Sequence, residues 1–351
     1  MLPYITFSGR KIVTRIELFE KTERMFVLLA FFDLPKNKSR RAFFMKMKAL
    51  SHYENDKETK YGDCILLTGN SLVVYDCGHE RHAEEVKNYL KRLNVSEVHI
   101  VISHNDGDHT DGVLALMNHL KEAEYTVKVY TSLYLKSVNK IHKMLDDGRR
   151  RKNRTCEHIL ELFNHIQEIV DAAQDHGFTL VNAIPDTKVF EATIVGPTED
   201  EFAGVVAKAI ESDGKGSIDG ETVMNAASIQ LKCVLNDGKV LLLCGDASPE
   251  YLHELEEYDI IQLPHHGQLN DAEKVFEKLD NSDSDSYEKE YLISDNTGKG
   301  YNSGGSEDLV KMMKKNKYSL AHNTQNGVVE LPKSESGNRR QGVVLGVMGC
   351  E

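Results

Sequence analysis

The segment Ser103-His104-Asn105-Asp106-Gly107-Asp108-His109 constrains the chain most, because it places two imidazoles and two carboxylates within six positions. It follows the short apolar run 98–102, which predicts a buried strand. Side chains on a loop that leaves a strand can converge. A mixture of imidazole and carboxylate suits Zn²⁺ or Mn²⁺ better than Ca²⁺, which prefers oxygen alone. For this segment alone, the alternative is a solvated turn with incidental histidines.

Three later segments place polar groups beside apolar strands. The run LLLC at 241–244 leads to Asp246, and the run IIQLP at 260–264 leads to His265 and His266. Asn225 stands just before the strand predicted at 228–235, and Ser228 begins it. These segments favour a metal site assembled from several loops over an accidental turn.

In this order, the motifs S-H-x-D-x-D-H-x-x-G, N-x-x-S, L-x-G-D and P-H-H-G resemble the metallo-β-lactamase superfamily. The resemblance is specifically to the family of metallo-β-lactamase-like domains related to the hydrolase domain of the bacterial DNA-uptake protein ComEC. The residues Gly-Asp-Cys at 62–64 and Tyr-Asp-Cys-Gly at 75–78 resemble the opening hairpin of that family, and Ser294, Asn296, Thr324 and Gly327 resemble its closing strands. The likeness covers about residues 44–332.

The resemblance implies a centre with two divalent metal ions, Zn²⁺ or Mn²⁺. It assigns one ion to His104 and Asp106, a second ion to Asp108, His109 and His265, and a bridging position to Asp246. The superfamily usually has histidine where Asp106 stands, and often a further histidine where this chain offers Asn225 or Ser228. The first site is therefore poorer in nitrogen, which makes Mn²⁺ an alternative to Zn²⁺.

The mechanism that the resemblance implies is hydrolysis by a hydroxide shared between two cations about 3.5–4 Å apart. Asp108 is the candidate that orients this nucleophile. His266 is the candidate that donates a proton or binds a phosphate oxygen, and the alternative for His266 is a supporting or exposed histidine.

The expected fold is α/β (α+β), with strands in two sets that are each flanked by helices. The resemblance implies a four-layer αββα metallo-β-lactamase sandwich over residues 44–332, with a helical insertion at about 133–176. Residues 1–43 are an N-terminal extension of unknown role, and residues 333–351 are a C-terminal tail. Periodicity predicts, among other elements, a strand at 189–195 and helices at 80–93, 114–123, 249–257, 271–279 and 306–316.

Composition and charge limit the partners and the location. A net charge of −12 weighs against indiscriminate binding to a phosphate backbone. The basic runs 36–48 and 136–154, the second with Arg149, Arg150, Arg151, Lys152 and Arg154, are either solvated faces or a wall for a nucleic acid or nucleotide. Six cysteines without a C-x-x-C pair favour a cytoplasmic location. The apolar run 25–34 is too short to span a membrane and predicts a buried segment, with a signal sequence as the alternative.

We therefore predict a metal-dependent hydrolase, with a phosphodiesterase or nuclease favoured by the resemblance. The fold alone cannot choose the substrate, so hydrolysis of a small ester, lactone or thioester is the alternative enzyme hypothesis. A third hypothesis is an effector or regulatory subunit of a larger assembly, for example a defence-type one, which docks through residues 1–43.

Overall fold

The computed structural model describes residues 6–7, 10–11, 45–51, 62–145, 152–212, 217–218, 221–282, 284–295, 306–316, 318 and 321–333. The chain forms two compact units, Met1–Ala42 and Phe43–Glu351. In the first unit, β1 (Thr6–Phe7) pairs with β2 (Arg10–Lys11) in antiparallel fashion. The apolar run 25–34, the basic residues 149–151 and Asn296 lie outside the described residues.

Two seven-stranded sheets form the second unit. The first has the order β18-β3-β4-β5-β6-β7-β8, with β3 (Lys46–Ala49), β4 (Ile65–Thr68), β5 (Leu72–Tyr75), β6 (Glu97–Val101), β7 (Thr126–Thr131), β8 (Thr179–Asn182) and β18 (Val329–Leu331). The second has the order β17-β16-β15-β14-β13-β10-β9, with β9 (Lys188–Val189), β10 (Ala192–Gly196), β13 (Gln230–Val234), β14 (Val240–Leu243), β15 (Ile260–Gln262), β16 (Glu290–Ile293) and β17 (Ala321–Asn323). A short pair, β11 (Ser217–Ile218) and β12 (Glu221–Thr222), stands apart.

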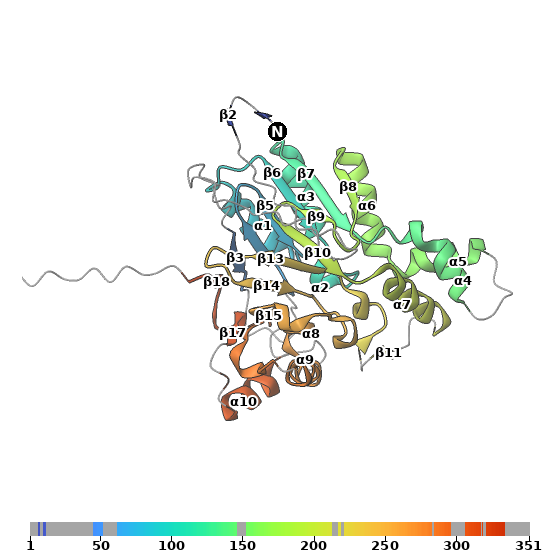
Figure 1. The fold of residues 1–351 in the computed structure, drawn as a ribbon. Coiled ribbons are helices and arrows are strands. Elements are labelled where there is room, and N and C mark those ends of the chain that lie inside the picture. Colours follow the sequence, from blue (N-terminus) through green and yellow to red (C-terminus); the bar gives the residue numbers. More distant parts are fainter. Residues whose placement is uncertain are drawn as a thin grey trace, which may run out of the picture. The chain divides into compact units, whose positions relative to one another are not determined.

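Helices cover the outer face of each sheet (Figure 1). The first sheet packs against α1 (Glu80–Leu90), α3 (Val113–Glu122) and α6 (Asn164–His176), and the second against α9 (Leu269–Asn281) and α10 (Glu307–Lys315). The inner faces of the two sheets pack on each other through apolar side chains, among them Leu67, Val73, Leu231 and Leu243. The predicted four-layer αββα sandwich is therefore confirmed.

Alternation of side chains along the strands explains these layers. In β5, Leu72 and Val74 belong to the cluster under the helices, whereas Val73 and Tyr75 belong to the cluster between the sheets. All four side chains are buried because both faces of this strand are covered.

The parallel strands of both sheets end toward the site. β5, β6, β7 and β8 run parallel in the first sheet, and β14, β15, β16 and β17 run parallel in the second. Ligands of open α/β sheets bind outside the carboxyl ends of such strands. The loops after β5, β6, β14 and β15 carry the polar residues singled out in the sequence.

The segment 133–176, predicted as a helical insertion, contains several helices among its described residues. It contains the 3₁₀ turn η1 (Tyr134–Ser137) and the helices α4 (Val138–Met144), α5 (Lys152–Leu162) and α6. Among the described residues, no helix is long and apolar enough to cross a membrane.

Two local predictions were wrong. The helix expected at 249–257 is two 3₁₀ turns, η3 (Pro249–Tyr251) and η4 (Leu255–Glu257), because Glu254 adopts the left-handed conformation with φ 51° between them. The strand expected at 189–195 is a tight hairpin of β9 and β10, with Phe190 at φ 57° in its turn. The helix α7 (Glu199–Glu211) was missed, although Thr198 and Glu201 form a capping box at its start.

Candidate metal centre

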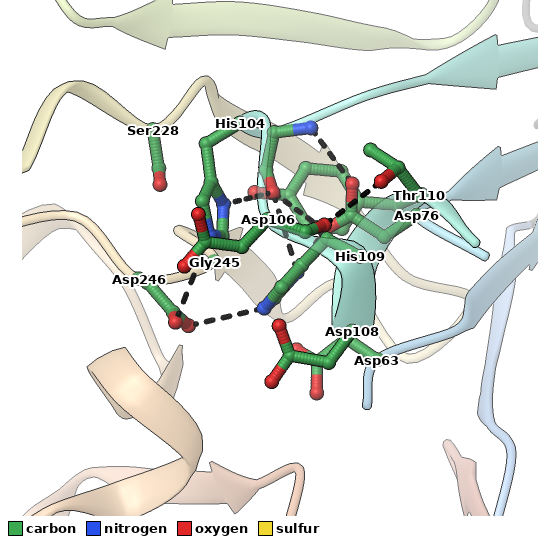
Figure 2. Close-up of polar contacts among 12 residues, drawn as sticks. Asp63, Asp76, His104, Asp106, Asp108, His109, Thr110, Ser228, Gly245 and Asp246 are labelled. Atoms are coloured by element: carbon green, nitrogen blue, oxygen red, sulfur yellow. Dashed lines mark hydrogen bonds and ion pairs between the residues drawn. The ribbon is translucent and has the colours of Figure 1, made fainter. Parts of the chain in front are cut away.

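The motif residues come together at the carboxyl ends of strands from both sheets (Figure 2). His104 and Asp106 follow β6, and Asp108 and His109 lie on the single helical turn α2 (Gly107–Thr110). Asp246 follows β14 from the other sheet. After β15, the turn α8 (Pro264–Gly267) carries both His265 and His266.

His104 and His109 are oriented by one buried carboxylate, Asp76, which follows β5. The Oδ2 atom of Asp76 lies 2.8 Å from Nδ1 of His109 and accepts a hydrogen bond of 2.7 Å from the Ser103 hydroxyl. The same hydroxyl lies 2.9 Å from Nδ1 of His104. The Nδ1 atoms are thus engaged, and both Nε2 atoms are buried with no hydrogen-bond partner among the described residues.

His266 is oriented by a second buried carboxylate, Asp63, which stands before β4. Nδ1 of His266 lies 3.1 Å from Oδ1 of Asp63. The other oxygen of Asp63 accepts hydrogen bonds from Gln262 Nε2 (2.6 Å) and from Ser294 Oγ (2.8 Å). Nε2 of His266 is also buried without a hydrogen-bond partner among the described residues.

The unengaged nitrogen atoms surround the carboxylate of Asp246. Oδ1 of Asp246 lies 3.4 Å from Nε2 of His109, and Oδ2 lies 3.8 Å from Nε2 of His104 and 3.9 Å from Nε2 of His266. Asp246 is only 2% exposed, and its Oδ1 has no hydrogen-bond partner among the described residues. Three nitrogen atoms from two segments, the loop after β6 and the turn α8, therefore face one buried carboxylate.

Asp106 and Asp108 complete the cluster on its open side. Oδ2 of Asp108 lies 3.4 Å from Nε2 of His266, and Oδ2 of Asp106 lies 3.9 Å from Nε2 of His104. The side chain of Asp106 is 44% exposed and that of Asp108 is 16% exposed, whereas the side chain of His104 is 2% exposed. The cluster is thus reached from solvent past these two carboxylates.

These distances fit a metal site. Ligands at 2.0–2.1 Å from a tetrahedral Zn²⁺ lie about 3.4 Å apart, which matches the pairs His109–Asp246 and Asp108–His266. His104, His109 and Asp246 offer atoms that lie within 4.8 Å of one another, and so do Asp63, His109 and His266. Both oxygens of Asp63 already accept hydrogen bonds, so Asp63 acts here as the partner that orients a ligand.

The electrostatics of the protein alone point the same way. Burial by itself lowers the pKa of His109 and of His266, but Asp246 and the carboxylates behind the rings raise both well above their ordinary value. Burial by itself raises the pKa of Asp246, and the facing histidines hold it well below its usual range. Positive charge is therefore favoured between these residues, and a divalent cation supplies it while leaving the imidazoles neutral.

His104 and Asp108 also shift. Burial, followed by the neighbouring His109, lowers the pKa of His104 and keeps its ring neutral, as a metal ligand must be. Burial raises the pKa of Asp108, but the contact with His266 and the nearby His109 outweigh burial and lower it, so Asp108 is ionised.

The structure places His266 in contact with other candidate ligands, and His265 also acts electrostatically on Asp246. The resemblance gave the ligand position to His265 and a proton-donating role to His266, but Nε2 of His266 is the atom that lies beside Asp108 and Asp246. The ring of His265 is set perpendicular to that of His266, with ring centroids 5.9 Å apart. Both residues have positive φ angles in a sharp turn, so strand alternation no longer decides which ring faces the centre.

Asn225 and Ser228, the suggested substitutes for a further histidine, are hydrogen-bonded to each other. Asn225 is part of the 3₁₀ turn η2 (Asn225–Ala227), and the Ser228 hydroxyl donates a 2.8 Å hydrogen bond to the Asn225 carbonyl oxygen. Ser228 lies on the His104 side of the centre in Figure 2. Its role as a ligand stays a prediction.

A glycine lets the loop that carries Asp63 approach the loop that carries Asp108. Gly62 has φ +60°, and a Cβ atom there would lie 1.7 Å from the carbonyl oxygen of Asp108. The next residue, Asp63, donates its N–H to that same oxygen at 3.0 Å. Only glycine combines this conformation with this close approach.

Sequence reasoning gave no role to four residues that position the site: Asp63, Asp76, Gln262 and Ser294. Asp63 and Asp76 had been noted in the motifs at 62–64 and 75–78, and Ser294 as part of a closing strand. Gln262 was not singled out. The sequence carried a signal for two of the four. Asp63 stands just before the first strand of the hairpin β4–β5, and Asp76 stands just after the second.

No family model and no curated protein matches the sequence. Among solved structures, the metallo-beta-lactamase fold protein YhfI from Bacillus subtilis is similar over 82% of this chain and 99% of its own, with 11% identity and a TM-score of 0.42. Human tRNase Z, short form, is similar over 79% of this chain and 89% of its own, with 12% identity and a TM-score of 0.36.

The layers and strand orders described above show the four-layer αββα sandwich that the resemblance in the sequence implied. The narrower kinship to ComEC-like domains stays a prediction from the motifs.

Proposed function

We propose that the chain is a metal-dependent hydrolase that cleaves phosphodiester bonds in a nucleic acid or nucleotide. The observation that carries the metal centre is the convergence of four buried atoms without hydrogen-bond partners among the described residues: Nε2 of His104, His109 and His266, and Oδ1 of Asp246. Buried polar groups in folded proteins are rarely left unpaired, and so many at one point call for a cation.

In this proposal the centre holds two divalent cations, Zn²⁺ or Mn²⁺. His104 and Asp106 would hold one, Asp108 and His266 would hold the other, and His109 and Asp246 lie near both pairs and would contribute to either. When bound, two such cations lower the pKa of water so that it attacks near neutral pH, and they stabilise negative charge that develops on the substrate.

The residues of the chain prepare this chemistry. Asp76 and Asp63 each accept a hydrogen bond from Nδ1 of a histidine. The proton of the neutral ring is then on Nδ1, and the lone pair of Nε2 is available for a cation. Asp106 and Asp108 stand at the open side, where a substrate enters. Asp108 is ionised, so it can orient an attacking water.

Two observations support a phosphodiester as the substrate. The motif with Asp106 in place of a histidine resembles the ComEC-like branch. Three carboxylates beside three imidazoles also make a harder ligand set than a histidine-rich one, which suits cations that bind phosphate oxygens. Hydrolysis of a lactone or thioester is the competing outcome of the test below.

The test combines metal analysis with assays on single-stranded DNA, RNA, cyclic dinucleotides and a chromogenic phosphodiester, each with and without Mn²⁺. We expect cleavage by the wild type, loss of it in Asp246→Asn and His109→Ala, and retention in Asp111→Asn, which removes an exposed charge from the same loop. Cleavage of a lactone or thioester but of no phosphodiester would refute the substrate class.

The ligand assignment has its own test. His266→Ala should reduce the bound metal from two ions per chain to one, whereas His265→Ala should retain two, because Nε2 of His266 lies beside Asp108 and Asp246. The opposite result would restore the assignment made from the sequence.

Docking of a protein partner through residues 1–43 stays a prediction, and a native mass from cell extract that shows only free monomer would contradict it.

A further inference from the structure

Gln262, at the end of β15, connects the two halves of the candidate centre. It is fully buried, and its Nε2 donates to Asp63 Oδ2 at 2.6 Å and to Ser294 Oγ at 2.9 Å. Its Oε1 accepts the backbone N–H groups of Cys244 at 3.0 Å and Gly245 at 3.2 Å.

These four hydrogen bonds use the whole capacity of the amide. The nitrogen has two protons and donates both, and the oxygen has two lone pairs and accepts twice. A rotated amide would place its NH₂ group against two N–H donors and its oxygen against the carboxylate of Asp63. The orientation of Gln262 is therefore fixed by its surroundings.

Each end of the amide leads to a different candidate ligand. The donor end holds Asp63, whose other oxygen contacts Nδ1 of His266. The acceptor end holds the backbone of Cys244 and Gly245, immediately before Asp246. The link to Asp63 spans 199 positions of sequence, so it joins segments that the backbone does not hold together.

We propose that Gln262 is a positioning residue that sets the placement of Asp246 relative to His266, and with it the affinity for the second cation. This inference rests on the proposed metal-dependent function. An apolar side chain of the same length would fill the space, but it would leave two buried N–H groups unaccepted and would remove a donor from Asp63, so the role is more than packing.

Three substitutions separate the two ends of the amide. Gln262→Glu keeps the acceptor end, loses the donors and places a carboxylate against Asp63. Gln262→Lys keeps a donor for Asp63 and leaves the N–H groups of Cys244 and Gly245 without an acceptor. Gln262→Met removes both ends at similar length. Gln230→Met is the matched control, because Gln230 is a buried glutamine on β13 whose amide donates to the Tyr251 carbonyl oxygen and not to Asp63.

The experiment titrates the metal-free full chain with Co²⁺, followed by visible absorbance, and with Zn²⁺ in competition with a chromophoric chelator. We expect Gln262→Glu to bind the first ion as the wild type does and the second about 10- to 100-fold more weakly, which is the usual effect of losing an outer partner. Gln262→Lys should weaken both ions, because Asp246 contacts both, and Gln230→Met should weaken neither.

Ser294→Ala is the milder variant if the substitutions at 262 prevent folding. It removes one donor from Asp63 and leaves Gln262 in place, so it should weaken the second ion by a smaller factor. If Gln262→Glu, Gln262→Lys and Ser294→Ala all bind both ions like Gln230→Met, Gln262 only supports the structure and the proposal is overturned.

The two proposals fail in different ways. Selective loss of the second ion in Gln262→Glu, together with a wild type that cleaves no phosphodiester, would uphold the positioning role and overturn the substrate class. Unchanged ion binding in every variant of an active wild type would do the reverse. A wild type that binds no divalent cation would overturn both.

Discussion

Asp76→Asn removes one charge from the candidate centre without changing the size of the side chain. Asp76 is completely buried and accepts three hydrogen bonds: from Ser103 N at 2.7 Å, from Ser103 Oγ at 2.7 Å and from Nδ1 of His109 at 2.8 Å. In the asparagine variant, the amide oxygen best takes the place of Oδ1, because an unaccepted buried backbone N–H would cost about 1–3 kcal/mol. The NH₂ group then faces His109.

This arrangement changes the tautomer of His109. An NH₂ group that faces Nδ1 requires Nδ1 to accept, so the proton of the neutral ring moves to Nε2, the atom that faces Asp246. A protonated Nε2 cannot bind a cation. We expect the affinity for divalent cations to fall about 10- to 100-fold, as is usual for a lost outer partner, which corresponds to about 1.4–2.8 kcal/mol.

The assay is competition for Zn²⁺ and Mn²⁺ against a chromophoric chelator, with unfolding of the metal-free proteins measured in parallel. Asp111→Asn is the control, because it removes the same charge from an exposed position on the motif loop. Affinities of Asp76→Asn within about twofold of wild type would refute the argument that Asp76 selects the tautomer of His109. A fall in Asp111→Asn as large as in Asp76→Asn would show that net charge alone decides the affinity.

Three further predictions concern the fold around the centre. In urea denaturation, Gly62→Ala should lower the free energy of unfolding by at least about 2 kcal/mol, because it combines a left-handed conformation with a backbone clash. The control is Gly204→Ala on α7, which has open space at its Cβ and should be neutral or stabilising in the same measurement. Burial lowers the pKa of His99, so the contribution of its neutral ring to stability is complete above about pH 6.5 and is lost as the pH falls through that value toward the lowered pKa. The urea midpoint of His99→Gln should therefore decline less on acidification than that of the wild type. An equal decline would contradict this. Asn105 accepts an N–H of the first turn of α6, so Asn105→Ala should cost about 1 kcal/mol and speed hydrogen exchange there, while α1 exchanges as before.

The elements that sequence patterns predicted well are those in which one physical signal dominates. The strands at 98–102 and 260–263 are runs of apolar residues that end at polar ones, and the structure has β6 and β15 there. The helix at 80–93 was recognised from its apolar face, and α1 ends three residues earlier.

The missed elements have weaker or conflicting signals. The segment that forms α7 follows a Gly-Pro pair and was passed over, although its capping box was readable. The apolar spacing of 249–257 suggested a helix, but a left-handed Glu254 divides it, and spacing alone does not report such a conformation. Local pattern therefore predicted elements better than it predicted their interruptions.

The residues of the candidate centre also differ in how well the sequence predicted them. The ligand loop at 104–109 was readable because its residues are close in sequence, and Asp246 because it ends a strand. The choice between His265 and His266 depends on backbone angles within one turn, which residue identity does not reveal. The network of Asp63, Gln262 and Ser294 was not readable, since its hydrogen bonds join residues up to 231 positions apart.

The position of the centre between the sheets explains why it needs such long-range bonds. One sheet supplies the loop after β6 and the other supplies the loops after β14 and β15, so no single sheet fixes the spacing between the ligand groups. Apolar packing between the sheets is non-directional and does not by itself set a spacing to a few tenths of an ångström. Hydrogen bonds do, and the bond from Gln262 to Asp63 crosses between the sheets at the level of the centre. The polar residues behind the ligands therefore determine the distance between the two halves, and changes there should affect metal binding before they affect the fold.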